Sequence, residues 1–433
     1  MAEKNEIISY LKHCKICGND NLKKVIELNE QYISATFIKS NEESDLKKIK
    51  TPLSLSLCSD KSDVKSCGHL QLQEIINPDL LYRNYFYRSA ISDTMRNDLK
   101  DVVNSVIQIS QPNAKDIIVD TGSNDCTLLN FYPNNLQLVG FEPAKNIKFI
   151  DEGKNIKVIS NYFNAKNFTD NFNKKAKIVT SCAMFYDLIN PKSFVKDIAD
   201  ILDDNGIWCV QISYLLLMIK NMNFYDICHE HLSYHSIKSF ENLIKQFGLK
   251  VFNAEINDVN GGSVRLYVCK NNCKQYIDNK FSANLNKLRE EENKYKLEDE
   301  NTFFEYQKKI NILKDKTNQY IDQVIQQNNV VLALGASTKG NILLQHFGID
   351  KNKIQYISER NPDKVGLRCV GTDIELISEE KARSLKPKAM IVLPWYFKKE
   401  IVKREKKYIN EGGELMFPMP YPHVVTKEAE IKL

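Results

Sequence analysis

The sequence has no apolar run approaching the roughly 18 residues of a membrane-spanning helix, and residues 1–5 contain no hydrophobic signal segment. We therefore expect a cytoplasmic protein without a membrane partner. An excess of charge is also missing, because 60 Lys and Arg residues face 55 Asp and Glu residues and the net charge of +5 is spread along the chain. The composition therefore gives no indication of nucleic-acid binding.

A disulfide framework is not indicated either. The 11 cysteines are an odd number, and most stand alone in apolar segments, which is typical of reduced buried thiols. The length of 433 residues exceeds what one hydrophobic core usually supports, so we expect two or three domains. Alternating strand-like and helix-like segments predict an α/β fold with parallel sheets.

Four cysteines near the start suit a metal site. Cys14 and Cys17 flank a tight turn that ends in glycine, and Cys58 with the Cys67-Gly68-His69 segment supplies a second pair. We expect a structural Zn²⁺ held by Cys14, Cys17, Cys58 and Cys67. Eight residues separate Cys58 from Cys67, whereas a zinc ribbon has about two to four. Four buried thiols, or a site in which His69 replaces one sulfur, are the alternatives.

A cofactor site is predicted where two consecutive strands end. Residues 116–120 form a strand pattern that leads into Thr121-Gly122-Ser123-Asn124-Asp125 and then a helix pattern. The next strand pattern, residues 136–141, leads into Glu142, which lies roughly twenty residues beyond Asp120, the spacing of an acid that binds ribose. The three-glycine fingerprint of dinucleotide sites is absent, and Asp125 would repel a pyrophosphate. The turn therefore favours an adenosyl sulfonium cofactor over a nicotinamide cofactor, with an ordinary strand-helix junction as the alternative.

The segment Tyr225-Asp226-Ile227-Cys228-His229-Glu230-His231 gathers ionisable side chains beside aromatic ones. With His235, it holds three of the seven histidines. A histidine oriented by a carboxylate can accept a proton at neutral pH and return it, which is general-base chemistry. The two-histidine zinc helix needs ligands four residues apart, so His-Glu-His does not match it. A polar surface patch is the alternative.

The C-terminal half predicts a long helical stretch followed by a second α/β unit. Residues 285–327 are polar with spaced apolar positions, as in a helix with one solvated face. The segment Gly335-Ala336-Ser337-Thr338-Lys339-Gly340 then joins a strand pattern to a helix pattern, where backbone amides and Lys339 can contact an anion. Earlier in the chain, Asn260-Gly261-Gly262-Ser263 allows close ligand approach. A plain turn is the alternative for both segments.

Together these segments resemble the sugar C-methyltransferase family that modifies nucleotide-linked deoxysugars. The resemblance covers nearly the entire chain, in the same order. It rests on the four cysteines, Tyr85-Phe86-Tyr87-Arg88-Ser89, Gly122-Ser123-Asn124-Asp125, Phe141-Glu142-Pro143, His229-Glu230-His231, Gly261-Gly262-Ser263 and residues 335–340. It implies a zinc-binding module at 1–75, a methyltransferase domain binding S-adenosylmethionine at 76–283, a helical linker at 284–328 and a Rossmann-like domain at 329–433.

The resemblance also implies an activity, the transfer of a methyl group to the carbon beside the ketone of a nucleotide-linked keto-sugar through an enolate. It assigns the base to His231, oriented by Glu230, and gives zinc no part in the chemistry. The implied catalytic residues are His231, Glu230, His229, Tyr85 and Tyr87. The implied cofactor-binding residues are Asp120, Gly122, Asn124, Asp125, Glu142 and Pro143. The implied substrate-binding residues are Tyr186, Cys228, Gly262, Ser263, Arg265, Ser337 and Lys339.

Three departures from the family pattern indicate a divergent branch acting on another sugar. Cys126 stands where the family usually has glycine, Cys228 where many relatives have tyrosine, and Tyr186 where a histidine is usual. These departures keep open a non-methylating isomerase or epimerase that binds the adenosyl ligand structurally. Two further alternatives are a nicotinamide-dependent sugar oxidoreductase, which the turn at Gly122 disfavours, and a zinc-containing binding protein without catalysis.

Overall fold

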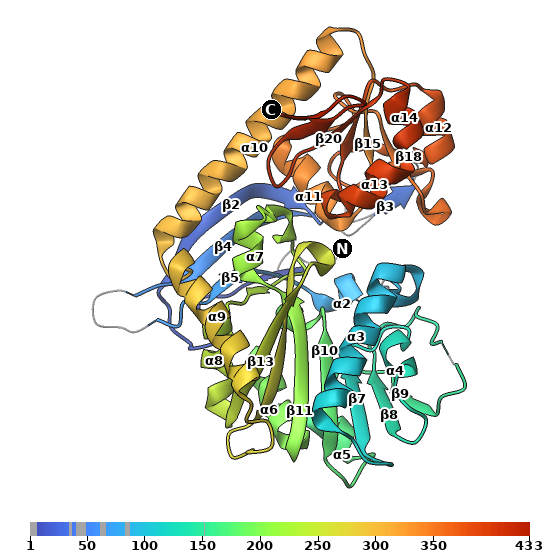
Figure 1. Cartoon of the computed structure of the whole chain (residues 1–433). Helices are drawn as coiled ribbons and strands as arrows, with labels where there is room; N and C mark the ends of the chain where they lie inside the picture. Colours follow the sequence, from blue (N-terminus) through green and yellow to red (C-terminus); the bar gives the residue numbers. More distant parts are fainter. Residues whose placement is uncertain (1–6, 34–36, 40–48, 61–65, 83–86, 151) are drawn as a thin grey trace.

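The fold comprises two large sheets that flank a smaller N-terminal sheet, with one long helix along their side (Figure 1). The computed structural model describes residues 7–33, 37–39, 49–60, 66–82, 87–150 and 152–433. Tyr85, one of the predicted catalytic residues, lies outside these residues. None of the helices in the described ranges is long and apolar enough to cross a lipid bilayer.

The central sheet has seven strands in the order β13-β14-β11-β10-β7-β8-β9. Its parallel strands are β7 (Ile117–Thr121), β8 (Gln137–Phe141), β9 (Ile156–Ile159), β10 (Ala176–Cys182) and β11 (Leu202–Ser213). The antiparallel strands β13 (Leu249–Asn257) and β14 (Ser263–Lys270) complete one edge. The predicted α/β alternation is confirmed for this part of the chain, because apolar β-branched runs form strands that helices cover.

The helices of this part follow local signals in the sequence. In α6 (Pro191–Ile201), Pro191 occupies the first turn, where its missing N–H costs nothing, and the Asn190 side chain caps the helix. The other α-helices are α3 (Asp93–Ser110), α4 (Thr127–Asn130), α5 (Ala165–Thr169), α7 (Leu215–Lys220) and α8 (Ile237–Ile244). Short 3₁₀ turns are η2 (Ser89–Ile91), η3 (Phe185–Asp187), η4 (Phe224–Asp226), η5 (Lys245–Phe247) and η6 (Val259–Gly261).

The N-terminal module is a small antiparallel sheet in the order β12-β5-β4-β2. Its strands are β2 (Leu22–Tyr32), β4 (Lys50–Cys58), β5 (Leu70–Leu72) and β12 (Ser233–Tyr234). A separate pair joins β1 (Ile8–Tyr10) to β6 (Glu74–Ile76), followed by α2 (Pro78–Tyr82). The strand β12 comes from the histidine-rich segment, so this sheet directly holds the chain that carries His231.

The C-terminal sheet has nine strands in the order β22-β21-β20-β19-β15-β16-β18-β17-β3. Its strands are β15 (Val331–Leu334), β16 (Tyr356–Glu359), β17 (Leu367–Cys369), β18 (Glu375–Ser378), β19 (Ala389–Val392), β20 (Glu414–Phe417), β21 (His423–Val425), β22 (Glu430–Lys432) and β3 (Phe37–Lys39). Its helical elements are α11 (Thr338–Phe347), α12 (Glu379–Ser384), α13 (Lys398–Arg404), α14 (Lys406–Asn410), η7 (Pro362–Lys364) and η8 (Trp395–Phe397). The strand β3 pairs with β17 across more than three hundred residues of sequence.

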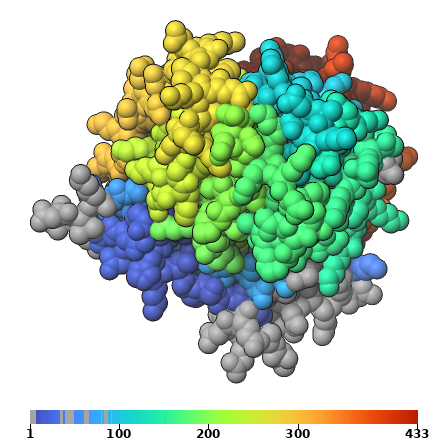
Figure 2. All heavy atoms as spheres, turned by 90° about the horizontal axis from the view of Figure 1, so that it is seen from below, coloured from blue at the N-terminus to red at the C-terminus, as the bar shows by residue number. Residues whose placement is uncertain are grey.

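The expected helical stretch consists of α9 (Asn279–Tyr295) and α10 (Glu300–Gln326). With 27 residues, α10 is about 40 Å long at 1.5 Å per residue and runs from beside the central sheet to the C-terminal one (Figure 1). From below, the elements of the central sheet, coloured cyan to yellow, cover most of the face, with the N-terminal module at one edge (Figure 2).

One continuous apolar core joins the three parts. It includes Leu55 of β4, Trp208 of β11, Ile310 of α10 and Ile391 of β19. The domain boundaries at residues 75, 283 and 328 stay a prediction, and β3 and β12 both cross them to join a sheet of another part.

Candidate functional site

The four N-terminal cysteines converge on one point. Their Sγ atoms all lie within 4.8 Å of one another, with 3.4 Å between Cys14 and Cys67 and 3.5 Å between Cys17 and Cys58. Tetrahedral zinc with Zn–S bonds of about 2.3 Å places its sulfur ligands about 3.8 Å apart. The donor set therefore fits one Zn²⁺, and the alternative with His69 as a ligand is not adopted.

Backbone turns create this geometry. Gly18 and Gly68 both have positive φ, 80° and 66°, as expected for tight turns at the two cysteine pairs. The Gly18 N–H donates to the Cys14 carbonyl, and the Gly68 N–H donates to the Cys58 carbonyl at the end of β4. Hydrogen bonds from Cys58 and Cys67 lower the pKa of Cys14, as expected when thiols share one negative charge.

The predicted cofactor turn joins β7 to α4 with three residues in the left-handed region. These are Gly122 (φ 73°), Asn124 (φ 49°) and Cys126 (φ 66°). A Cβ on Gly122 would lie 3.3 Å from Met184 Cγ, so a side chain there would crowd the turn. Cys126 occupies a conformation that glycine adopts more readily, which gives a physical reason for the family's usual glycine.

Glu142 stands at the carboxyl end of β8 and faces this turn. Its Oε2 accepts a hydrogen bond from the Asn124 N–H, and its Oε1 accepts one from the Ala144 N–H beyond Pro143, both at 2.8 Å. A carboxylate has about four acceptor positions, so each oxygen retains one. The site fits a ligand with two adjacent hydroxyl groups, as the ribose of an adenosyl cofactor has.

Asp125 and Asp120 also have hydrogen-bond partners within the protein. The Asp125 Oδ2 accepts from the Ala90 N–H at 3.0 Å, and its Oδ1 accepts from the Thr127 hydroxyl at 2.6 Å. The buried Asp120 accepts from the Thr180 hydroxyl at 2.6 Å, and burial raises its pKa to about 7. These contacts give both acids a role in shaping the turn.

The histidine-rich segment separates its histidines. His231 lines a small cavity with Tyr186, Ser213 and Tyr214, among others, and its ring lies 4.4 Å from that of Tyr186, edge to face. His229 is fully buried against the backbone of Thr51 and Pro52 in β4. Only His231 of this pair is placed to meet a ligand.

The carbonyl oxygen of Asp226 orients the His231 ring. It lies 2.8 Å from Nδ1, and this contact requires that Nδ1 carries the proton, which leaves Nε2 as a proton acceptor. The expectation that Glu230 orients this ring is therefore corrected, because the backbone carbonyl of Asp226 holds Nδ1.

Burial and the positive charge of Lys339 lower the pKa of His231 to about 3. The imidazole is therefore neutral at physiological pH. A neutral ring can accept a proton, and its proton affinity rises when negative charge develops on a bound substrate.

The sequence matches three families in order along the chain: "Putative zinc binding domain" at residues 14–82, "Methyltransferase domain" at 93–254 and "C-methyltransferase C-terminal domain" at 258–420. The C-methyltransferase NovU of Streptomyces niveus is 23% identical over 429 residues, which span 98% of this chain and 100% of NovU. Together these matches support a C-methyltransferase family for this chain. The predicted zinc module and methyltransferase fold are thereby confirmed, in agreement with S-adenosylmethionine as the cofactor.

Two solved methyltransferases each match part of this chain. An S-adenosylmethionine-dependent methyltransferase from Clostridium acetobutylicum is 13% identical, and the match covers 42% of this chain and 93% of that one with a TM-score of 0.34. The magnesium protoporphyrin IX methyltransferase of Synechocystis is 8% identical, with coverage of 40% and 79% and a TM-score of 0.31.

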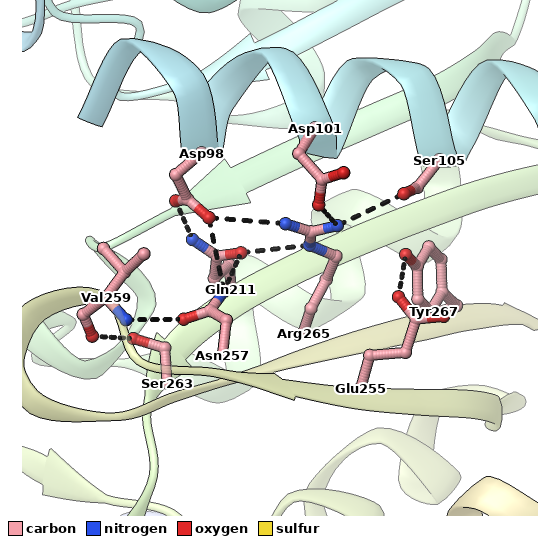
Figure 3. Close-up of polar contacts among 10 residues, drawn as sticks. All are labelled: Asp98, Asp101, Ser105, Gln211, Glu255, Asn257, Val259, Ser263, Arg265 and Tyr267. Carbon is pink, nitrogen blue, oxygen red and sulfur yellow. Dashed lines mark hydrogen bonds and ion pairs between the residues drawn. The ribbon is translucent and has the colours of Figure 1, made fainter. Parts of the chain in front are cut away.

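Arg265 lies in a buried network of the C-methyltransferase, not at a ligand surface (Figure 3). Its guanidinium donates to Gln211 at 3.0 Å and to Asp101 at 2.9 Å, and forms an ion pair with the buried Asp98 at 3.4 Å. These acids belong to α3, so Arg265 ties that helix to β14. The prediction that Arg265 binds substrate is corrected, because its donors are engaged and only 3% of the residue is exposed.

The remaining predicted substrate residues lie at three places. The Ser263 hydroxyl donates to the Val259 carbonyl, and a Cβ on Gly262 would come within 2.8 Å of Leu217, so this turn packs tightly on α7. Cys228 is buried, which raises the pKa of its thiol. Ser337 caps α11, and Lys339 reaches the histidine-rich segment. Tyr87, one of the predicted catalytic residues, is exposed and stands two residues before η2.

Sequence reasoning assigned no role to Asp226, Ser213 or Tyr214, although all three line the cavity beside His231. Asp226 belongs to a segment that the sequence did single out. Its contribution comes from a backbone carbonyl, which any residue type supplies, so no residue pattern signals it.

Lys15 links the cysteine cluster to the cavity. It stands between Cys14 and Cys17, and its Nζ donates to the Leu188 carbonyl at 2.5 Å, immediately after η3. The Lys15 N–H donates to Gln71 of β5 at 2.9 Å. Since η3 carries Tyr186, the metal module supports the loop that lies against His231.

Proposed function

We propose that this C-methyltransferase transfers the methyl group of S-adenosylmethionine to the carbon beside the ketone of a nucleotide-linked keto-sugar. The substrate class comes from the resemblance of the motifs, and transfer to carbon agrees with the NovU relative, a C-methyltransferase. The observation that carries the mechanism is the geometry of His231, whose Nδ1 is held by the Asp226 carbonyl while the ring lines a cavity.

In this proposal, His231 Nε2 accepts the proton from the carbon next to the ketone. The electron pair of the broken C–H bond moves into the enolate, whose carbon then attacks a methyl group. Bound S-adenosylmethionine supplies that methyl group on a positively charged sulfur. Transfer to carbon needs such a base because a C–H bond, unlike an amine, offers no free electron pair.

The protein's main contribution is orientation. Glu142 holds the ribose, the turn at Gly122 brings the cofactor to the end of β7, and Tyr186 with Ser213 offers hydroxyl groups beside His231 for the sugar. Aligning two reactants within one site replaces an encounter in solution, which removes a large entropic part of the barrier. In this scheme Zn²⁺ is structural.

The test compares His231→Gln with His229→Gln in deuterated buffer, using a nucleoside-diphosphate-linked 4-keto-6-deoxyhexose as the probe. We expect wild type and His229→Gln, if folded, to exchange the α-proton and add a methyl group, and His231→Gln to do neither while still binding the cofactor. Mass spectrometry reads both events. Exchange and methylation by His231→Gln at the wild-type rate contradict the proposal. Exchange without methylation in the wild type favours the isomerase or epimerase.

A further inference from the structure

Lys339 crosses from the C-terminal sheet to the histidine-rich segment. It lies in the first turn of α11, where Ser337 caps the helix by accepting from the Gly340 N–H at 3.0 Å. Its Nζ forms an ion pair with Asp226, whose side chain is 3% exposed. The first turn of a helix disfavours a cation, because the helix dipole is positive there. The ion pair with Asp226 offsets this cost.

The surrounding packing keeps Lys339 in place. Phe347 at the end of α11 stacks on Phe224 of η4, with ring centroids 5.5 Å apart. A Cβ on Gly340 would lie 2.9 Å from the Leu393 side chain, so the start of α11 packs directly on the chain after β19. The ammonium group also lies 5.8 Å from the Tyr225 ring centroid, over its face. The helix therefore presents Lys339 to Asp226 from a fixed position.

Asp226 contacts two other residues, one through its side-chain carboxylate and the other through its backbone carbonyl. Its carboxylate pairs with Lys339, and its carbonyl oxygen holds Nδ1 of His231. The same carbonyl accepts a hydrogen bond from the Tyr234 hydroxyl at 3.3 Å. Moving the Asp226 backbone would therefore change which nitrogen of His231 carries the proton.

We propose that Lys339 is a positioning residue, which through its ion pair with Asp226 fixes His231 as the neutral Nδ1–H tautomer. Because Lys339 belongs to the C-terminal part of the chain, the orientation of His231 then depends on the packing of that part against the histidine-rich segment. The role of His231 as the base rests on the proposed function, whereas its tautomer does not. This interpretation replaces the expectation that Lys339 contacts an anion of the substrate.

The electrostatic part of the proposal concerns the groups around the His231 ring. They include Lys339 of α11, Asp226 of η4, Tyr186 of η3, Tyr214 before α7 and Tyr234 of β12, with Cys228 and Glu230 adjacent in the chain. Burial is the largest cause of the low pKa of His231, and Lys339 lowers it further. Loss of the lysine charge leaves Asp226 uncompensated, so the pKa of His231 rises.

The first measurement is histidine nitrogen NMR on the full chain without substrate, assigned with His231→Gln. In the wild type we expect the Nδ1–H tautomer between pH 5 and 8. Lys339→Met and the milder Lys339→Gln should raise the pKa of His231 by roughly one unit or more and mix its tautomers. Lys339→Arg should restore the wild-type spectrum. Lys353→Met is the matched control, because Lys353 pairs with Asp322 far along α10 at 2.8 Å.

The second measurement is steady-state kinetics with the same keto-sugar probe. We expect Lys339→Met to lower kcat at least tenfold, a part of the roughly 10²–10⁴-fold that a positioned base contributes, with KM nearly unchanged and the acid limb of kcat/KM moved to higher pH. An unchanged His231 titration in both uncharged variants overturns the proposal. A rise in KM with an unchanged kcat would indicate that Lys339 binds the substrate, and this result also overturns the proposal. Absence of any methyl transfer by the wild type would refute the proposed function and leave the NMR result intact.

Discussion

Replacing Arg265 with methionine tests whether the network under α3 is structural. The substitution keeps the length of the aliphatic chain and removes the guanidinium that joins β14 to Asp98 and Asp101 of α3. It leaves the Asp98 carboxylate buried, with hydrogen bonds from the Gln211 and Asn257 side-chain amides but without a counter-charge (Figure 3).

The expected cost follows from the exposure of the two acids. Asp101 has a side chain that is 67% exposed, so its pair with Arg265 contributes about 0–1 kcal/mol. The side chains of Asp98 and Arg265 are 5% and 4% exposed, and breaking a buried pair by removing one partner costs roughly 3–5 kcal/mol. We therefore expect the free energy of unfolding to fall by about 3–5 kcal/mol.

The loss should depend on pH. Burial already raises the pKa of Asp98 in the wild type, and Arg265 opposes that rise. Without Arg265 the folded-state pKa rises further above the unfolded value, so the folded protein binds more protons in acid. Its stability deficit is then greatest at neutral pH and becomes smaller as the pH falls through the folded-state pKa of Asp98.

Urea unfolding at pH 5 and pH 7.5 measures both effects. The control is Arg289→Met, which removes a partly exposed pair with Glu241 and should cost at most about 1 kcal/mol. The double variant Asp98→Leu with Arg265→Met should recover much of the loss, because no buried charge then lacks a partner. A loss below about 1 kcal/mol for Arg265→Met, or an equal loss at both pH values, would show that the reasoning is wrong.

Three further predictions concern the metal cluster and the cofactor turn. Elemental analysis should find one Zn²⁺ per chain, and Cys14→Ser should lose it together with thermal stability; a wild type without zinc refutes the site. Glu142→Ala should weaken S-adenosylmethionine binding by about 1–3 kcal/mol in calorimetry, and unchanged affinity would exclude its ribose role. The folded-state pKa of Asp120, about 7, lies above the unfolded value of about 3.9, so its contribution to stability is lost as the pH rises from about 4 through about 7. Asp120→Asn should flatten the decline in unfolding free energy between pH 4 and 8, and an unchanged slope contradicts this.

The elements that the sequence predicted well have local signals. Residues 117–121 are an apolar β-branched run followed by glycine, and they form the strand and turn expected of them. The four cysteines were predicted as zinc ligands from their residue type, because thiolates bind zinc wherever the fold brings them together. The short strands β3 and β12 were missed, because strands of three and two residues show no periodicity and depend on partners far along the chain.

The candidate site was predicted in part, for a related reason. His231 was identified by its residue type and its neighbours. Its orientation by the Asp226 carbonyl was not, because a backbone group leaves no mark in the sequence. The pairing of Lys339 with Asp226 joins residues more than a hundred positions apart, so no local pattern predicts it. The glycine-rich segment before Arg265 predicted a ligand contact, but the acids of α3 that surround Arg265 come from a distant part of the chain.

Transfer of a methyl group to carbon is the central claim, and the labelled product tests it most directly. The protein is incubated with S-adenosylmethionine carrying a ¹³C methyl group and a uniformly ¹³C-labelled nucleoside-diphosphate-linked 4-keto-6-deoxyhexose. We predict a product in which the labelled methyl carbon shows one-bond coupling to the ring carbon beside the ketone, and no such product from His231→Gln. A labelled methyl group attached to oxygen or nitrogen, or cofactor binding without transfer to this sugar class, would contradict the account.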